Sequence, residues 1–180
     1  LKNWQRVGQR EPFLSASPLG AGAYDIQTII GPSAPVVHND ELFFYYTGIK
    51  QYAFVGSGND PSYEDYVPDA GAICLAILRR DGFLSLDAGE TPGKLTTRPC
   101  VLPGGRLRVN VAVRKHGHLQ IEALNSNGDV LAVSVPITRD ERRAEVAWKR
   151  GNIIDLKGQL VHLRFTLCRS GLYSYWYDTP

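Results

Sequence analysis

The chain has 180 residues, 43% of them hydrophobic, which is enough for one large globular domain or two small ones with a real core. Twenty Lys and Arg against 18 Asp and Glu leave a formal net charge of +2, with no basic run longer than a pair. This balance argues against nucleic acid as a partner. No apolar run approaches the ~18 residues of a membrane span, so no membrane partner is expected either.

The first half of the chain predicts short strands separated by turns. Residues 25–31 alternate weakly, and residues 34–48 predict a hairpin with a turn at Asn39-Asp40. Residues 49–70 are rich in Gly, Pro, Asp and Tyr and predict a long loop, of a kind that often carries function. Residues 71–80 are apolar on both faces, which predicts a central strand.

The character of the sequence changes near residue 90. A turn at Asp81-Gly82 leads into a short apolar segment, and residues 88–94 are rich in Gly, Pro and Thr. Aromatic-rich strands precede this point and strands with charged outer faces come after it. We therefore expect one sheet over residues 1–90 and a second domain over residues 91–180.

The second half alternates more cleanly. In residues 106–115 one face is apolar and the other polar, with Leu107, Val109, Val111 and Val113 opposite Arg106, Arg108, Asn110 and Arg114. Residues 118–137 predict a hairpin around Asn127-Gly128, and residues 160–167 predict a half-buried strand. Strands at this spacing indicate an antiparallel β-sandwich, so the fold class is all-β. One helical turn is expected at most, at Asp140–Ala144.

Several motifs resemble a known family. "NWQRVGQREPFL" (3–14) resembles the segment that precedes a blade in five-bladed β-propeller proteins of the glycoside hydrolase type, the invertase and arabinanase-like group, and "GAYDIQTIIGPSAPVVHNDELFFYYTG" (22–48) resembles the blade motif that follows it. "GAICLAILRRDGFLSLDAGE…GKLTTRPCVLPGGRLRVNV" (71–111) resembles the junction where such propellers pass into a C-terminal β-sandwich. "VHLRFTLCRSGLYSYWY" (161–177) is similar to the end of the C-terminal β-sandwich of that group. The resemblance implies a propeller-blade-like sheet followed by a sandwich.

The same resemblance implies a carbohydrate-active protein and carbohydrate as its partner. It also implies that further blades, which carry most of the catalytic carboxylates of the family, precede these residues. The chain is therefore expected to be the C-terminal part of a longer protein. Residues 1–90 are expected to pack on the sandwich or to pair with a second chain, giving a homo-oligomer through exposed sheet edges.

Glycoside hydrolysis needs a pair of carboxylates. Asp25 is the catalytic candidate, because it comes directly after Tyr24 at the start of the blade-like strand, where the chain of the family approaches its central cavity. The alternative role for Asp25 is to cap a turn. Glu64, Asp65 and Asp69 in the long loop would bind a cation or a sugar hydroxyl, or would form a solvated acidic loop.

Tyrosines supply the stacking surfaces that sugar rings require. The candidate substrate-binding residues are Tyr24, Tyr46, Tyr52, Tyr63, Glu64, Asp65 and Tyr66. Packing in the core or against a partner is the alternative for the tyrosines, because side chains alternate between the faces of a strand.

Other kinds of site receive little support. Cys74, Cys100 and Cys168 have no metal-binding or disulfide spacing, and we expect them to be small buried apolar residues. His116 and His118 lack a third ligand, so no metal and no cofactor are expected. Two alternatives to glycan hydrolysis stay open: a non-catalytic sandwich module that binds glycan or stabilises an assembly, and a hydrolase of another, esterase-like class.

Overall fold

The computed structural model describes residues 12–31, 34–50 and 69–178, and it confirms the all-β class with antiparallel sheets. The first strands are β1 (Thr28–Ile30), β2 (Val36–His38), β3 (Glu41–Ile49) and β4 (Gly71–Arg79). The later elements are β5 (Leu86–Ala88), β6 (Gly93–Thr96), β7 (Cys100–Val101), β8 (Arg106–Leu124), β9 (Val130–Ser134), β10 (Glu141–Glu145), β11 (Trp148–Arg150), the 3₁₀ helix η2 (Ile153–Leu156) and β12 (Leu160–Asp178).

The chain divides into two compact units, Leu1–Leu78 and Arg79–Pro180. The division lies earlier than the expected change near residue 90, because β5 pairs with β12 and thereby places residues 86–88 in the second sheet. The turn at Asp81-Gly82 therefore does not close a hairpin: β4 and β5, the strands on either side of it, belong to different sheets.

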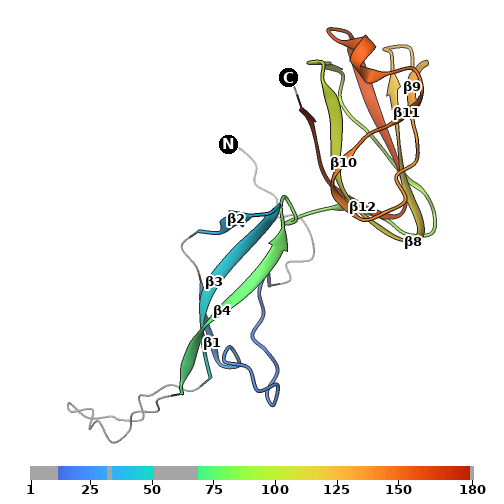
Figure 1. Cartoon of the computed structure of the whole chain (residues 1–180). Coiled ribbons are helices and arrows are strands. Elements are labelled where there is room, and N and C mark those ends of the chain that lie inside the picture. Colours follow the sequence, from blue (N-terminus) through green and yellow to red (C-terminus); the bar gives the residue numbers. More distant parts are fainter. Residues whose placement is uncertain (1–11, 32–33, 51–68, 179–180) are drawn as a thin grey trace, which may run out of the picture. The chain divides into compact units, whose positions relative to one another are not determined.

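The first unit contains sheet A, which consists of β1, β2, β3 and β4 (Figure 1). The predicted hairpin is confirmed: β2 and β3 pair antiparallel around a turn in which Asn39 and Asp40 have φ of 47° and 59°. These two residue types tolerate the left-handed backbone that such a turn requires. Among the described strands β4 pairs with β3 alone, so the described part of sheet A does not show the central position expected for residues 71–80.

One face of sheet A is covered by the segment that precedes β1. Leu42, Phe44 and Tyr46 on β3 are buried on this face at 7–8% exposure. The ring of Phe13 packs edge-on against that of Phe44, with 5.1 Å between the centroids. The opposite face carries the exposed apolar residues of β3 and β4.

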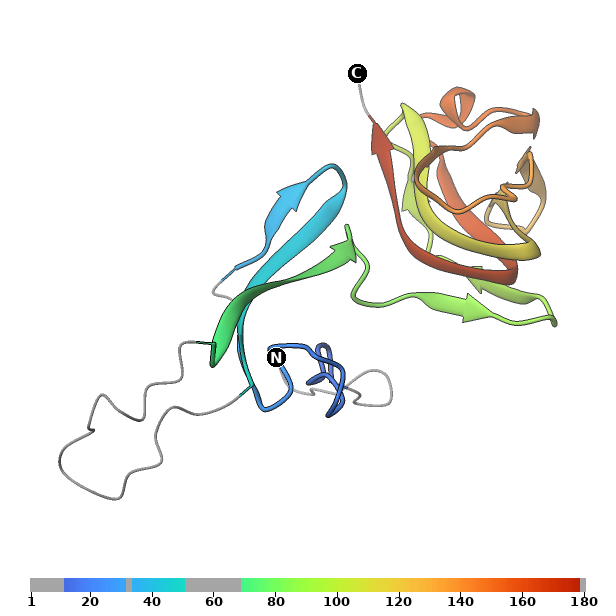
Figure 2. The same ribbon diagram turned by 60° about the horizontal axis from the view of Figure 1, so that its bottom comes forward.

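The second unit is built on sheet B, which contains the remaining eight strands. β8 and β12 have 19 residues each and pair along their length, from Leu124 opposite His162 to Arg106 opposite Asp178. Both strands bend sharply at the same level (Figure 2). At the bend Gly117 is required, since a Cβ there would lie 2.5 Å from the Arg169 carbonyl oxygen.

The bend lets sheet B fold over itself, so that its two halves enclose one core in the manner of a sandwich. The ring of Phe165 from one half lies 5.1 Å from that of Tyr175 in the other half. The predicted inward faces are confirmed, although Val113 is only half-buried against the core. The other members are at most 3% exposed: Leu107, Val109, Val111, Val161, Leu163, Phe165 and Leu167.

The chain enters the second unit through a short anchored segment. The Arg79 guanidinium lies over the Tyr173 ring, 4.5 Å from its centroid, and donates to Asp140 at 3.1 Å. The Asn110 amide donates to the Arg80 carbonyl at 2.6 Å. This contact explains why Asn110, expected on the outer face of its strand, is only 1% exposed.

The helical expectation at Asp140–Ala144 is wrong, because Glu141–Glu145 forms β10 and pairs antiparallel with β8. Tertiary pairing overrides the local preference there. The short 3₁₀ helix lies later in the chain, where Asn152 caps it by accepting a hydrogen bond from the Ile154 N–H at 3.1 Å.

Candidate functional site

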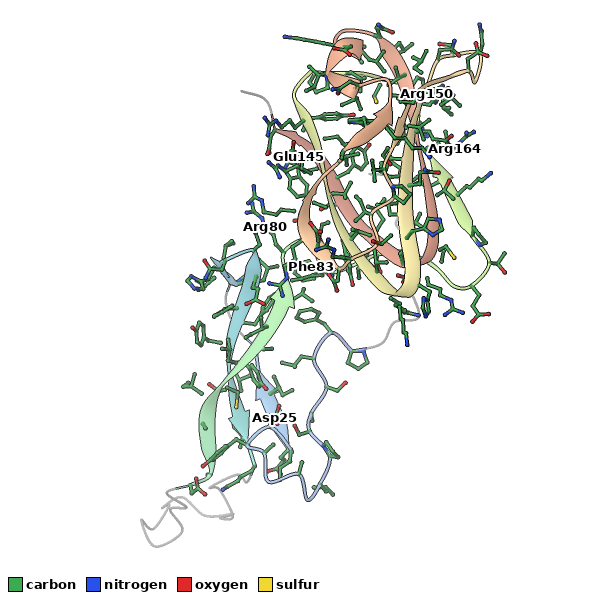
Figure 3. All side chains as sticks on the ribbon, turned by 45° about the vertical axis from the view of Figure 1, so that its right-hand side comes forward. Asp25, Arg80, Phe83, Glu145, Arg150 and Arg164 are labelled. Atoms are coloured by element: carbon green, nitrogen blue, oxygen red, sulfur yellow. The ribbon has the colours of Figure 1, made fainter. Side chains whose placement is uncertain are left out.

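The strongest candidate site lies at the end of sheet A where β3 ends and β4 begins. Figure 3 marks Asp25 at this end of the sheet. Asp25 is 6% exposed, and its carbonyl accepts from the Ser17 N–H at 3.2 Å, which holds the preceding segment in place. Gly48 on β3 makes this approach possible, because a Cβ at that position would lie 2.9 Å from the Asp25 nitrogen.

The Asp25 carboxylate is surrounded by hydroxyl donors. The Tyr46 hydroxyl donates to Asp25 Oδ2 at 2.7 Å. Hydrogen bonds from the hydroxyls of Ser17 and Tyr46, in that order, lower the pKa of Asp25 below its usual value. The same carboxylate, together with burial, raises the pKa of Tyr46 to about 12. At neutral pH this end of the sheet therefore contains an ionised carboxylate and a protonated phenol.

A second cluster lies next to Asp25 and is more accessible. The Tyr24 hydroxyl donates to Asp69 Oδ1 at 2.5 Å, and the Lys50 ammonium forms an ion pair with the other Asp69 oxygen. The Lys50 ammonium also lies over the Tyr24 ring, 4.6 Å from its centroid. The Asp69 side chain keeps 65% of its surface exposed, so one side of this cluster faces solvent.

The two carboxylates of this site share one electrostatic property. Lys50 first and Tyr24 second lower the pKa of Asp69, as the hydroxyls lower the pKa of Asp25. A general acid for glycoside hydrolysis needs a raised pKa so that it still holds a proton at neutral pH. The geometry therefore favours Asp25 and Asp69 as hydrogen-bond acceptors or as an ionised partner, and not as the proton donor.

Some of the predicted site residues lie together in the structure, and others lie outside the described residues. The structure brings Tyr24, Asp25 and Tyr46 together at one end of sheet A. Tyr46 is buried, and its hydroxyl donates a hydrogen bond to Asp25. The other predicted residues, Tyr52, Tyr63, Glu64, Asp65 and Tyr66, lie outside the described residues. The described neighbours of their segment meet at this site, where the Lys50 N–H donates to the Ala70 carbonyl at 2.9 Å.

Sequence reasoning did not identify Lys50 and Ser17 as members of this site. For Lys50 a signal existed, since Lys50 and Asp69 carry opposite charges and flank residues 51–68 between β3 and β4, and such pairs meet across neighbouring strands. For Ser17 the sequence held no comparable signal, because its contact with Asp25 depends on how the segment before β1 crosses the sheet.

The histidines and cysteines form no second site in the described part of the chain. His38 shares a hydrogen bond with the Asn39 amide, and His162 Nδ1 contacts the Thr97 carbonyl oxygen at 2.9 Å. Neither contact is to a serine nucleophile. The cysteines Cys74, Cys100 and Cys168 are free thiols and only half-buried, less enclosed than expected. No group of three metal-ligating side chains occurs among the described residues.

Comparisons with known proteins assign no family and no function to the chain. No protein-family model matches the chain, and searches of the curated proteins and of the solved structures gave no significant match. Within the described ranges there is also no helix with the length and apolar character needed to span a membrane.

Proposed function

We propose that the chain is the C-terminal part of a carbohydrate-active, glycoside-hydrolase-like protein, in which the end of sheet A around Asp25 binds sugar hydroxyls. The observation that supports this most is the arrangement of Asp25 and Asp69, two ionised carboxylates on neighbouring segments that already accept hydrogen bonds from hydroxyl groups. Sugar hydroxyls are donors of the same kind, and charge-assisted hydrogen bonds to carboxylates are among the stronger ones.

Within this site the accessible residues make the contact and the buried ones position them. Asp69 and Tyr24 lie on the open side, where Asp69 can accept from a ligand in place of Tyr24. Asp25 is buried behind them and fixes Tyr46 and the segment that carries Tyr24. Neither carboxyl group holds a proton to donate at neutral pH, because both have a lowered pKa.

The test combines glycan-array binding with hydrolysis assays on aryl glycosides. The expected result is glycan binding without turnover by this chain alone, with binding weakened at least tenfold by Asp69→Asn. A matched control is Asp155→Asn, which changes an exposed Asp in the second unit and should leave binding unchanged.

Three results would count against the proposal. Binding to no glycan would overturn it, and equal binding by the wild type and Asp69→Asn would remove the site from it. Turnover of an aryl glycoside that Asp25→Asn abolishes would make Asp25 a catalytic residue instead. Turnover of an aryl ester lost on a single Ser→Ala change would favour a hydrolase of another class.

A further inference from the structure

The accessible cluster of the candidate site, Tyr24, Lys50 and Asp69, already holds an ammonium group. The Lys50 ammonium forms an ion pair with Asp69 and lies over the Tyr24 ring, 4.6 Å from its centroid. The face of an aromatic ring and a carboxylate both attract a cation, and together they form a recurring environment for ammonium ligands. The Lys50 ammonium therefore marks a position in which a cation is stabilised from two sides.

The two groups that Asp69 binds are of different kinds. Its Oδ2 accepts from the Lys50 ammonium, and its Oδ1 accepts from the Tyr24 hydroxyl at 2.5 Å. An amino sugar such as glucosamine carries an ammonium and a hydroxyl on adjacent ring carbons. One carboxylate can accept from both of these groups at once, in the bidentate manner that is typical of strong recognition of charged groups. Lys50 and Tyr24 thus supply from the chain itself the pair of donors that an amino sugar would bring.

The ring and the carboxylate are held in place without the Lys50 side chain. Tyr24 comes directly before Asp25, which is buried and fixes this part of the segment. Asp69 is positioned through the backbone, because the Lys50 N–H donates to the Ala70 carbonyl at 2.9 Å. A ligand that displaces the Lys50 ammonium therefore still meets Asp69 and the Tyr24 ring in their present positions.

The Lys50 ammonium is bound weakly enough to be displaced. The side chains of Lys50 and Asp69 are 30% and 65% exposed. An ion pair with this exposure contributes little to stability, because water screens the charges and the long lysine side chain loses rotamer freedom when it is fixed. A ligand ammonium can take its place while the Lys50 ammonium returns to water.

The charge of the site favours a cationic sugar over an anionic one. The site contains two ionised carboxylates, Asp25 and Asp69, and one ammonium, that of Lys50. An anionic sugar would have to bind Lys50, whose ammonium is already paired, and would be repelled by both carboxylates. A cationic sugar replaces Lys50 and is attracted by the same two carboxylates.

We propose that the site binds amino sugars, and that the ligand ammonium takes the position that Lys50 occupies between Asp69 and the Tyr24 ring. Lys50 is then an internal competitor, which weakens the binding of every ligand that carries an ammonium group. The inference rests on the carbohydrate function proposed above and adds the class of sugar to it. A lysine side chain of a peptide offers the same ammonium but lacks the adjacent hydroxyl for the second oxygen of Asp69.

The test is calorimetric titration of the full chain with a glucosamine oligosaccharide and with its fully N-acetylated form, at a slightly acidic pH that keeps the amines protonated. The wild type is expected to prefer the glucosamine form. Lys50→Met removes the competitor, so it should raise the affinity for this form about fivefold and change the affinity for the N-acetylated form by less than about twofold. Asp69→Asn should abolish the preference.

The matched control is Lys149→Met, which removes an exposed lysine of β11 in the second unit. It lowers the net charge by the same amount as Lys50→Met, so it controls for long-range attraction of a cationic ligand, and it should leave both affinities unchanged. Circular dichroism checks that each variant folds, and Lys50→Gln serves as a second variant.

The outcomes separate this inference from the carbohydrate function on which it rests. Equal binding of the two oligosaccharides, or no gain in affinity for the glucosamine form in folded Lys50→Met and Lys50→Gln, would overturn the amino-sugar inference and leave the carbohydrate function standing. Binding of a lysine-rich peptide without binding of the glucosamine form would assign the ammonium position to a peptide instead. Binding to no glycan of any kind would overturn both.

Discussion

Sheet A and sheet B are built from similar amphipathic strands, but the apolar face of sheet B is buried, whereas sheet A has an apolar face that is exposed. Leu107, Val109 and Val111 on β8 are at most 1% exposed, whereas Ile73 and Ile77 on β4 keep more than half of their surface in water. The difference lies in the covering layer that each sheet can supply. β8 and β12 are long enough to bend and to form their own second layer, while the described strands of sheet A have nothing of this kind on their open side.

This contrast teaches that alternation predicts a strand and its buried face but not the source of the covering layer. A folded sheet such as sheet B is stable alone, because its own halves exclude water from the core. Sheet A has one face covered by the segment before β1, and its described strands leave the other face exposed. Single substitutions can test this contrast, beginning with the change expected to have the largest effect.

The largest loss of stability is expected when an aromatic ring is removed from the core of sheet B. Phe165→Ala leaves a cavity between the two halves of the sheet and is expected to lower the free energy of unfolding by about 3–5 kcal/mol. Urea denaturation followed by tryptophan fluorescence measures the loss. Val101→Ala in the same unit, at an exposed site, should change stability by less than about 0.5 kcal/mol. Similar effects of the two changes would contradict the self-enclosed core.

The second largest effect on stability is expected at Asn110, which holds the segment that enters the second unit. Asn110→Ala removes the amide that donates to the Arg80 carbonyl in a part-buried hydrogen bond, and the loss of such a bond costs about 0.5–1.5 kcal/mol. Asn127→Ala, an exposed turn residue, is the control and should be close to neutral. Thermal melting of both variants compares them, and an unchanged melting temperature for Asn110→Ala would show that the anchor adds nothing.

In sheet A the contribution of the Asp25–Tyr46 pair to stability depends on pH. Tyr46 has its pKa raised to about 12, so its contribution to stability is present below its ordinary pKa of about 10 and is lost as the pH rises toward 12. Asp25 has a lowered pKa, so its contribution is lost in acid, as the pH falls below the ordinary value of 3.8.

An absorbance titration at alkaline pH checks the first of these statements. The difference between the wild type and Tyr46→Phe isolates the ionisation of Tyr46, and Asp25→Asn should move that ionisation down toward about pH 10. A Tyr46 that titrates near its ordinary pKa in the wild type would mean that the hydrogen bond to Asp25 does not form in solution.

The smallest effect is expected at the surface of sheet B. Glu90→Gln removes an ion pair with Arg169 whose side chains are 83% and 39% exposed, and it should change stability by less than about 0.5 kcal/mol. Glu122→Gln breaks the pair with Arg164, in which the two side chains are 19% and 29% exposed and lie within the strand pairing. Chemical denaturation at low and high salt should rank Glu122→Gln as the more costly change.

Much of the fold could be predicted, because period-2 alternation and turn chemistry are local properties. The Asn39-Asp40 turn and the apolar rows of β8 and β12 were evident in this way. The pairing of β4 with β3 alone among the described strands was not evident, because an apolar strand indicates burial but does not say which element buries it. The strand at Glu141–Glu145 was missed for a similar reason, since its pairing with β8 is decided by distant residues.

The candidate site was predictable only in part. The neighbours Tyr24 and Asp25 stand out in the sequence, and their closeness to Tyr46 arises once the segment before β1 crosses β3. The lowered pKa of Asp25 depends on the Ser17 hydroxyl, whose position no local pattern encodes. Assigning Asp25 to catalysis remains a prediction, for which its hydrogen bonds give a direct test.

The pairing of β8 with β12 also determines how the second unit folds. Its closest partners in sequence are Leu124 and His162, and its most distant are Arg106, the first residue of β8, and Asp178, the last residue of β12. Such non-local pairing slows folding, because the long intervening segment must be ordered before the contacts form. During synthesis β8 must therefore wait for the last strand to emerge from the ribosome, and truncation within β12 should leave a collapsed, aggregation-prone chain.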